Sequence, residues 1–81
     1  MPKIPAIPGP YWFFFYSFDC NEPMHVHVQR DRSLAKFWLW PVALASSSGF
    51  PAHELRRLGR LVEGHREEFE EAWREFFAAQ R

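Results

Sequence analysis

The chain has a single cysteine, Cys20, and its charges cancel, with ten basic and ten acidic side chains among 81 residues. One cysteine excludes an internal disulfide and fits a reducing compartment. Zero net charge excludes the overall positive field that attracts nucleic acid. No apolar run approaches the roughly 20 residues that span a membrane. The start, MPKIPAIPGP, also lacks the apolar stretch of a signal peptide. We therefore expect a cytoplasmic protein without a membrane partner.

Aromatic side chains, in contrast, are abundant. They make up 19% of the chain, with nine Phe and four Trp. A chain of this length forms one domain at most and has a small core. Burial of each large ring contributes about 2–3 kcal/mol, so the rings can stabilise a small fold without disulfides or a structural metal. The same abundance predicts an exposed apolar surface that is covered by a small partner protein or by a second copy in a homo-oligomer.

Charge is distributed unevenly along the chain. Residues 30–36 carry Arg30, Arg32 and Lys36 against one acid, whereas residues 63–75 carry six glutamates against two arginines. Such a molecule has a basic part that suits an anion and an acidic part that suits a basic partner.

Periodicity in the first half predicts β-strands. Residues 1–10 carry four prolines and form an extended arm, and residues 11–81 form a single domain. The run YWFFFYSF (11–18) has strand length, and its apolar residues on both faces indicate a central covered strand or an interface. HVHVQR (25–30) alternates with period two, RDRS (30–33) is a turn, and LAKFWLW (34–40) is the next strand. Residues 42–45 are a candidate short edge strand, and SSSG (46–49) reads as a loop.

From Pro51 the apolar period becomes helical. Pro51 suits the first helical turn, and Glu54 lies near the positive end of the helix dipole. Two helices joined near Gly64 fit ordinary helix lengths, and one long kinked helix is the alternative. The prediction is an α+β fold, with an antiparallel meander of three to four strands followed by two C-terminal helices packed on one sheet face. The two apolar stripes consist of Leu55, Leu58, Leu61 and Val62, and of Phe69, Ala72, Trp73, Phe76 and Phe77.

The stretch EPMHVHVQRDR (22–32) places two histidines on one face of a predicted strand. A two-residue hairpin loop after residue 30 would make position 28 oppose 35, 27 oppose 36, 26 oppose 37 and 25 oppose 38. One face would then hold the valines and form core. The other face would hold the candidate functional cluster, and a one-residue slip would exchange the two faces. The cluster consists of His25, His27, Lys36 and Trp38.

Several roles are open to this cluster. Its imidazole, ammonium and indole groups suit an anion or a nucleobase, and phosphate or an oligonucleotide would bind more tightly as pH falls through the histidine range. One histidine as base and the other as acid, with Lys36 on the phosphate, could cleave RNA. Two ligands do not complete a metal site, Cys20 lies across a turn and Lys36 repels a cation, so we expect no metal. No cofactor motif is present. In the structural alternative the histidines bond locally, while Lys36 and Trp38 cover the sheet.

The segment from Gly9 to Trp73 resembles a small bacterial family, the domain of unknown function 4160. The resemblance is carried by FFFYS, EPMHVHV, AKFWL followed by PV, GF before the first helix, and HREEFEEAW. All four cluster residues match the family motif. The family has no established activity. Its genes resemble toxin–antitoxin modules in size and setting and often neighbour a second small family, which implies a small protein partner.

This chain differs from its relatives at several positions, including Pro51, where many relatives carry Ser. Trp12, Trp40 and Ala43 stand where relatives often carry charged residues, which favours a binding or assembly surface over catalysis. The leading hypothesis is therefore a protein-interaction component of a toxin–antitoxin-like module. The alternative is an RNA-directed toxin or nuclease, or a nucleic-acid-binding regulator, that uses the His/His/Lys cluster. Whether the chain is an enzyme stays open at this point.

Overall fold

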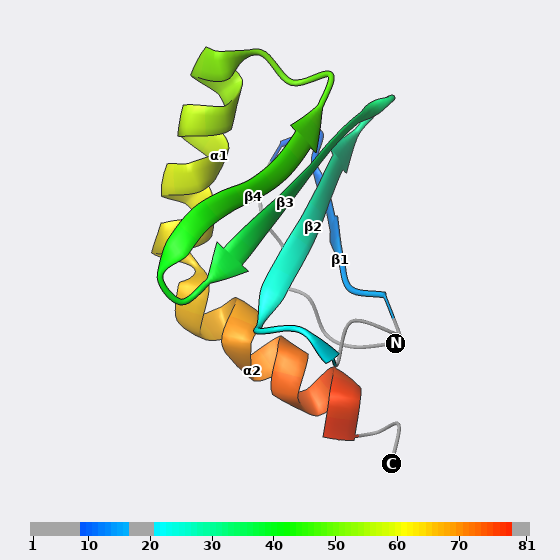
Figure 1. Cartoon of the computed structure of the whole chain (residues 1–81), viewed down its shortest axis with the longest axis vertical. Helices are drawn as coiled ribbons and strands as arrows, with labels where there is room; N and C mark the ends of the chain where they lie inside the picture. The colour runs from blue at the N-terminus through cyan, green and yellow to red at the C-terminus, as the bar shows by residue number, and fades with distance from the viewer. Residues whose placement is uncertain (1–8, 17–20, 79–81) are drawn as a thin grey trace.

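A four-stranded antiparallel sheet and two helices make up the fold (Figure 1), in a computed structural model that describes residues 9–16 and 21–78. The strand order is β1-β2-β3-β4, so strands adjacent in sequence are adjacent in space. Both helices pack on one face, and the described part of the chain leaves the other face open. The predicted α+β meander is thus confirmed. The elements are β1 (Trp12–Phe14), β2 (His25–Arg30), β3 (Ser33–Leu39), β4 (Val42–Ser48), α1 (Ala52–Gly64) and α2 (Arg66–Ala78).

The hairpin of β2 and β3 has the predicted register. Arg30 pairs with Ser33, so Asp31 and Arg32 form a two-residue loop. Asp31 has a φ of 55°, a left-handed conformation that aspartate tolerates better than most side chains. The remaining pairs follow the prediction, from position 28 opposite 35 to position 25 opposite 38. The valine side chains of β2 therefore face the helices, and the histidine side chains leave the strand on the opposite face of the sheet.

The core lies between the sheet and the helices. Val26 and Val28 of β2 are fully buried, as are Leu58 and Val62 of α1 and Phe69 of α2. Both predicted helical stripes face the sheet, because apolar residues three and four apart share one side of a helix. The buried core consists of Phe13, Phe15, Val26, Val28, Ala35, Phe37, Leu39, Phe50, Leu58, Val62, Phe69, Ala72 and Trp73.

The C-terminal half forms two helices, as favoured from sequence. The break falls at His65, whose amide donates to the carbonyls of Leu61 and Val62, each at 3.2 Å. Figure 1 shows the chain changing direction between α1 and α2 at this point. Pro51 precedes the first helical turn in an extended conformation, and α1 begins at Ala52. Within the described residues, neither helix is long and apolar enough to cross a membrane.

The prediction of a central strand for the aromatic run is wrong. Within the described residues, β1 comprises Trp12–Phe14 and is an edge strand that pairs with β2 and with no other described strand. Trp12 is 68% exposed, so the interface alternative is the one that remains. Residues 17 and 18 of the run, like residues 1–8 of the proline-rich arm, lie outside the described residues.

The prediction of a loop at SSSG is also wrong. Ser46, Ser47 and Ser48 pair with Lys36, Ala35 and Leu34, which extends β4 to seven residues. Pairing with β3 overrides the weak strand propensity of serine because that propensity depends on context. A bulge interrupts the ladder between the pairs of Lys36 and Phe37.

Gly49 ends β4 and must be glycine for two reasons. Its φ is 93°, and an added Cβ would lie 2.7 Å from the Ser33 hydroxyl oxygen. A side chain at this position would be strained in backbone conformation and would clash with the start of β3.

A polar cluster ties the start of α1 to the sheet. Arg30 Nε and Nη2 donate to the two carboxylate oxygens of Glu54 at 2.8 Å and 2.6 Å, and the Tyr11 hydroxyl donates to Glu54 Oε2 at 2.7 Å. Hydrogen bonds from Arg30 and then from Tyr11 lower the pKa of Glu54. The bond to Glu54, followed by burial, raises the pKa of Tyr11.

Core burial predicts unequal costs for two leucine truncations. Leu58→Ala removes a fully buried side chain and should lower the free energy of unfolding by about 2–5 kcal/mol. Leu34→Ala, on the open sheet face, should cost less than about 1 kcal/mol. Urea unfolding followed by circular dichroism measures both. Equal losses would contradict the assignment of the core to the helical face.

The Glu54 cluster predicts a specific acid response. Because the folded pKa of Glu54 lies below its ordinary value of 4.5, its contribution is fully present above that value. The contribution disappears as pH falls through the folded pKa. Glu54→Gln should therefore lower the urea midpoint at neutral pH, and the variant should lose less stability than the wild type on acidification. Glu71→Gln, an exposed change in α2, is the control and should follow the wild-type curve. A Glu54→Gln curve parallel to that of the wild type would refute the linkage.

Candidate functional site

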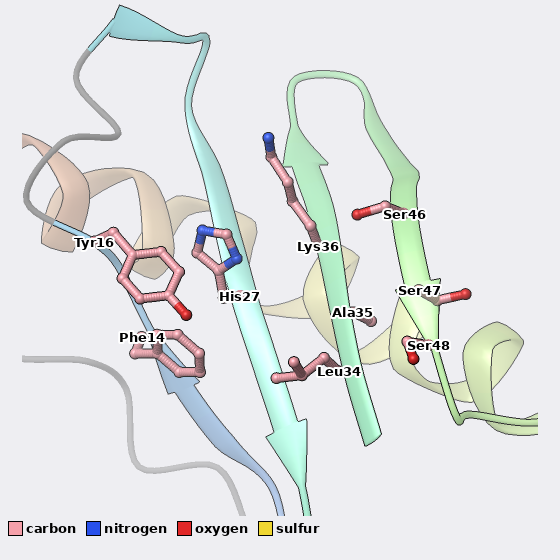
Figure 2. A pocket seen from close by; sticks show the side chains of 9 residues that line it. All are labelled: Phe14, Tyr16, His27, Leu34, Ala35, Lys36, Ser46, Ser47 and Ser48. Atoms are coloured by element: carbon pink, nitrogen blue, oxygen red, sulfur yellow. The ribbon is translucent and has the colours of Figure 1, made fainter. Parts of the chain in front are cut away.

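The open face of the sheet carries side chains in rows that cross all four strands. One row runs Phe14, His27, Lys36 and Ser46, and the next runs Trp12, Gln29, Leu34 and Ser48. A shallow hollow of about 370 Å³ lies over the first row. Figure 2 shows His27 and Lys36 projecting from neighbouring strands, with Tyr16 beside the imidazole. The lining residues are Phe14, Tyr16, His27, Leu34, Ala35, Lys36 and Ser46 to Ser48.

His27 is held between two aromatic rings. Its imidazole stacks on Phe14 with ring centres 5.4 Å apart and planes at 17°, and Tyr16 approaches edge-on at 4.7 Å. The side chain is half-buried. Both rings restrict its rotamers, so His27 presents a fixed imidazole edge to whatever enters the hollow.

Lys36 is already paired within the chain. Its ammonium lies 2.5 Å from Glu22 Oε1 and 4.6 Å above the centre of the Trp38 ring. The carboxylate and the indole face together compensate the lysine charge. The carboxylate of Glu22 thus occupies a position that an external anion would need in order to bind Lys36.

His25 belongs to the cluster by register but is fully buried. Its Nδ1 lies 2.8 Å from the Pro23 carbonyl oxygen and, because a carbonyl only accepts, this nitrogen carries the proton. The ring meets Trp38 at 5.6 Å and Trp73 of α2 at 5.0 Å. Packing against a helix residue therefore removes His25 from the accessible surface, as expected of a structural histidine.

The structure thus brings the predicted cluster together but divides its roles. The rings of His25 and His27 are 5.0 Å apart, and Trp38 and Lys36 stand beside them. Only three of the four side chains reach solvent. Burial of His25 weighs against a mechanism in which both histidines touch one substrate.

Sequence reasoning missed four neighbours of the cluster. Phe14 and Tyr16 could have been found, because alternation in YWFFFY puts them on the face of Trp12. Glu22 lies in an irregular turn, for which no periodicity gives a direction. Trp73 was predicted as core, and nothing local indicated that it would cover His25.

No three His, Cys, Asp or Glu side chains in the described ranges lie close enough together to hold a metal ion. Cys20, the third ligand considered from sequence, lies outside these ranges.

Comparison with known proteins identifies the family. The family described as domain of unknown function (DUF4160) matches residues 11–74, and the chain belongs to it. No curated protein and no solved structure shows significant similarity. The match covers all four strands, α1 and most of α2, so the open face and its hollow are part of the family domain.

The pairing of Lys36 with Glu22 makes anion binding testable. Phosphate should bind the wild type weakly, and more tightly as pH falls from about 8 to about 6, because histidines gain charge in this range. Glu22→Gln removes the competing carboxylate and should strengthen binding at every pH. NMR titration with inorganic phosphate, observed at His27 and Lys36, measures both effects. Unchanged affinity in Glu22→Gln would show that Lys36 is not an anion site.

Proposed function

We propose that this protein is a protein-interaction component of a two-protein, toxin–antitoxin-like module, and that it binds a small partner protein through its open sheet face. One observation carries the proposal: apolar side chains remain exposed around the hollow on that face. Trp12 is 68% exposed, and Tyr16 and Leu34 are each 42% exposed. Contiguous exposed apolar surface is typical of protein interaction sites, where Trp and Tyr supply much of the binding energy.

The polar groups around these side chains support a protein partner. Gln29 lies between Trp12 and Leu34 in one row, and Ser46 and Ser48 end the two rows on β4, so uncharged donors and acceptors alternate with the apolar side chains. Protein interfaces combine apolar contacts with hydrogen-bonding groups in this way. A nucleic-acid surface needs several cations for phosphate, whereas Lys36 on this face is neutralised by Glu22.

The family resemblance supports this setting of the module. Genes of such proteins often neighbour a second small gene, which would fit a cytoplasmic pair in which one protein controls the other. We propose the protein encoded by that neighbouring gene as the partner. Binding of that partner, rather than a chemical step, is then what this chain contributes to the module.

The RNA-directed alternative rests on a different observation. His27 and Lys36 are adjacent in the hollow, and a positioned imidazole beside an ammonium can serve acid–base chemistry on a phosphate ester. Growth arrest on expression, abolished by His27→Ala but not by Trp12→Ala, would favour this alternative.

Two exposed tryptophans provide a matched test of the proposed function. Trp12→Ala on the open face should weaken binding to the neighbouring-gene protein by about thirtyfold, the loss expected for a hot-spot residue. Trp40 is equally exposed, at 70%, but lies outside the open face, with the Arg66 guanidinium 4.4 Å from its ring centre. Trp40→Ala should leave the affinity unchanged.

Isothermal titration calorimetry on the purified proteins measures both affinities. Absence of a complex with the neighbouring-gene protein would overturn the choice of partner. A complex that is insensitive to Trp12→Ala would overturn the choice of surface.

A further inference from the structure

A second surface lies at the β4 border of the sheet on its helix-covered side, whereas the open-face hollow lies on the opposite side of the sheet. A groove of about 680 Å³ runs between the edge strand β4 and helix α1. Figure 1 shows these two elements side by side along the same border of the molecule. The sheet side of the groove is apolar, with Phe37, Val42 and Leu44, and Leu44 is 44% exposed.

Edge strand β4 lacks the usual barriers to pairing. Its sequence, VALASSS, contains no charged residue and no proline, and six of its seven residues are exposed. Natural edge strands are commonly protected by charges, prolines or bulges. Here the bulge between the pairs of Lys36 and Phe37 is the one such feature of β4, and it leaves short regular segments on either side of it.

The helical side of the groove is charged in a self-complementary order. Arg56, Gly59, Arg60 and Glu63 line it, spaced as one stripe of α1. Within the described part of the chain, neither arginine nor the glutamate forms an ion pair. A positive charge thus stands at one end of the stripe and a negative charge at the other, with Gly59 and Arg60 in between.

We propose that this groove is a two-fold interface between two copies of the chain. A two-fold axis perpendicular to the sheet makes β4 antiparallel to its symmetry mate and α1 antiparallel to its symmetry mate. With the axis between Gly59 and Arg60, Arg56 of each copy lies opposite Glu63 of the other. The interface then contains two equivalent ion pairs, Arg60 lies beside the glycine of the other copy, and Leu44 is covered.

Charge complementarity favours a second copy over an unrelated strand. Arg56 and Glu63 can each pair with the other residue of a second copy, because a two-fold axis places the same two residues opposite them in reverse order. An uncharged β4 adds no repulsion when it meets itself. A foreign acidic strand would satisfy the arginines and leave Glu63 facing like charge.

Charge reversal provides the test, with sedimentation velocity as the measurement. The wild type should show a concentration-dependent monomer–dimer equilibrium. Arg56→Glu puts a second carboxylate opposite Glu63 at both symmetric positions, and Glu63→Arg puts a second guanidinium opposite Arg56 at both. Each single variant should therefore dimerise at least about tenfold more weakly, because two attractive pairs become two repulsive ones.

Two combinations distinguish a two-fold interface from any other explanation. The double variant Arg56→Glu/Glu63→Arg regains complementarity and should dimerise like the wild type. An equimolar mixture of the two single variants should form a heterodimer, since each chain then carries the charges that the other lacks. Far-ultraviolet circular dichroism confirms that every variant is folded.

A pair of leucine changes separates this interface from the proposed partner surface. Leu44→Asp should abolish dimerisation, whereas Leu34→Asp on the open face should leave it intact and should weaken only binding of the partner protein. A wild type that stays monomeric up to its solubility limit would overturn the inference. Single variants that dimerise normally, or a mixture that does not pair, would overturn it as well.

Discussion

The pairing register of β2 with β3 is the constraint on which the rest of the structure depends. Val26 and Val28 must face the helices together with Ala35 and Phe37, and the two-residue loop at Asp31 fixes this alignment. A one-residue slip turns over one strand relative to the other. If β2 turned over, the valines would face solvent and His27 would enter the core; if β3 turned over, the Lys36 ammonium would be buried, which costs several kcal/mol without a partner. Burial of the valines on the helical face therefore determines which side chains lie on the open face.

Two surfaces of different chemistry remain once the core is filled. The open face offers aromatic rings around His27, in a hollow where Lys36 is already neutralised. The groove along β4 offers an apolar floor with charges of both signs on its helical side. The hollow reaches β4 through Ser46 to Ser48, whereas the groove lies on the helical side of the same strand. A dimer joined along β4 would present two open faces, and a partner that is itself dimeric would bind them with a raised apparent affinity.

The surroundings of His27 show which contacts local sequence patterns can predict and which they cannot. Alternation in HVHVQR and the short turn after it were enough to place His27 opposite Lys36, since both elements lie within a few residues of the contact. The same reasoning failed for the three serines of β4, which form a strand only because they pair with β3 through backbone hydrogen bonds. It failed again for the aromatic run, because apolar side chains on both faces indicate burial equally well in a central strand and at an interface.

The sequence by itself determined the two periodicities, the hairpin register and the two helical stripes, because each depends on residues that are near neighbours along the chain. Only the tertiary structure decided that Trp73 covers His25, that Glu22 neutralises Lys36 and that β1 stays at the edge of the sheet. These contacts join an irregular turn or a distant helix to the sheet. Their geometry depends on how completed elements pack, and a side-chain period contains no information about which element will cover a given face.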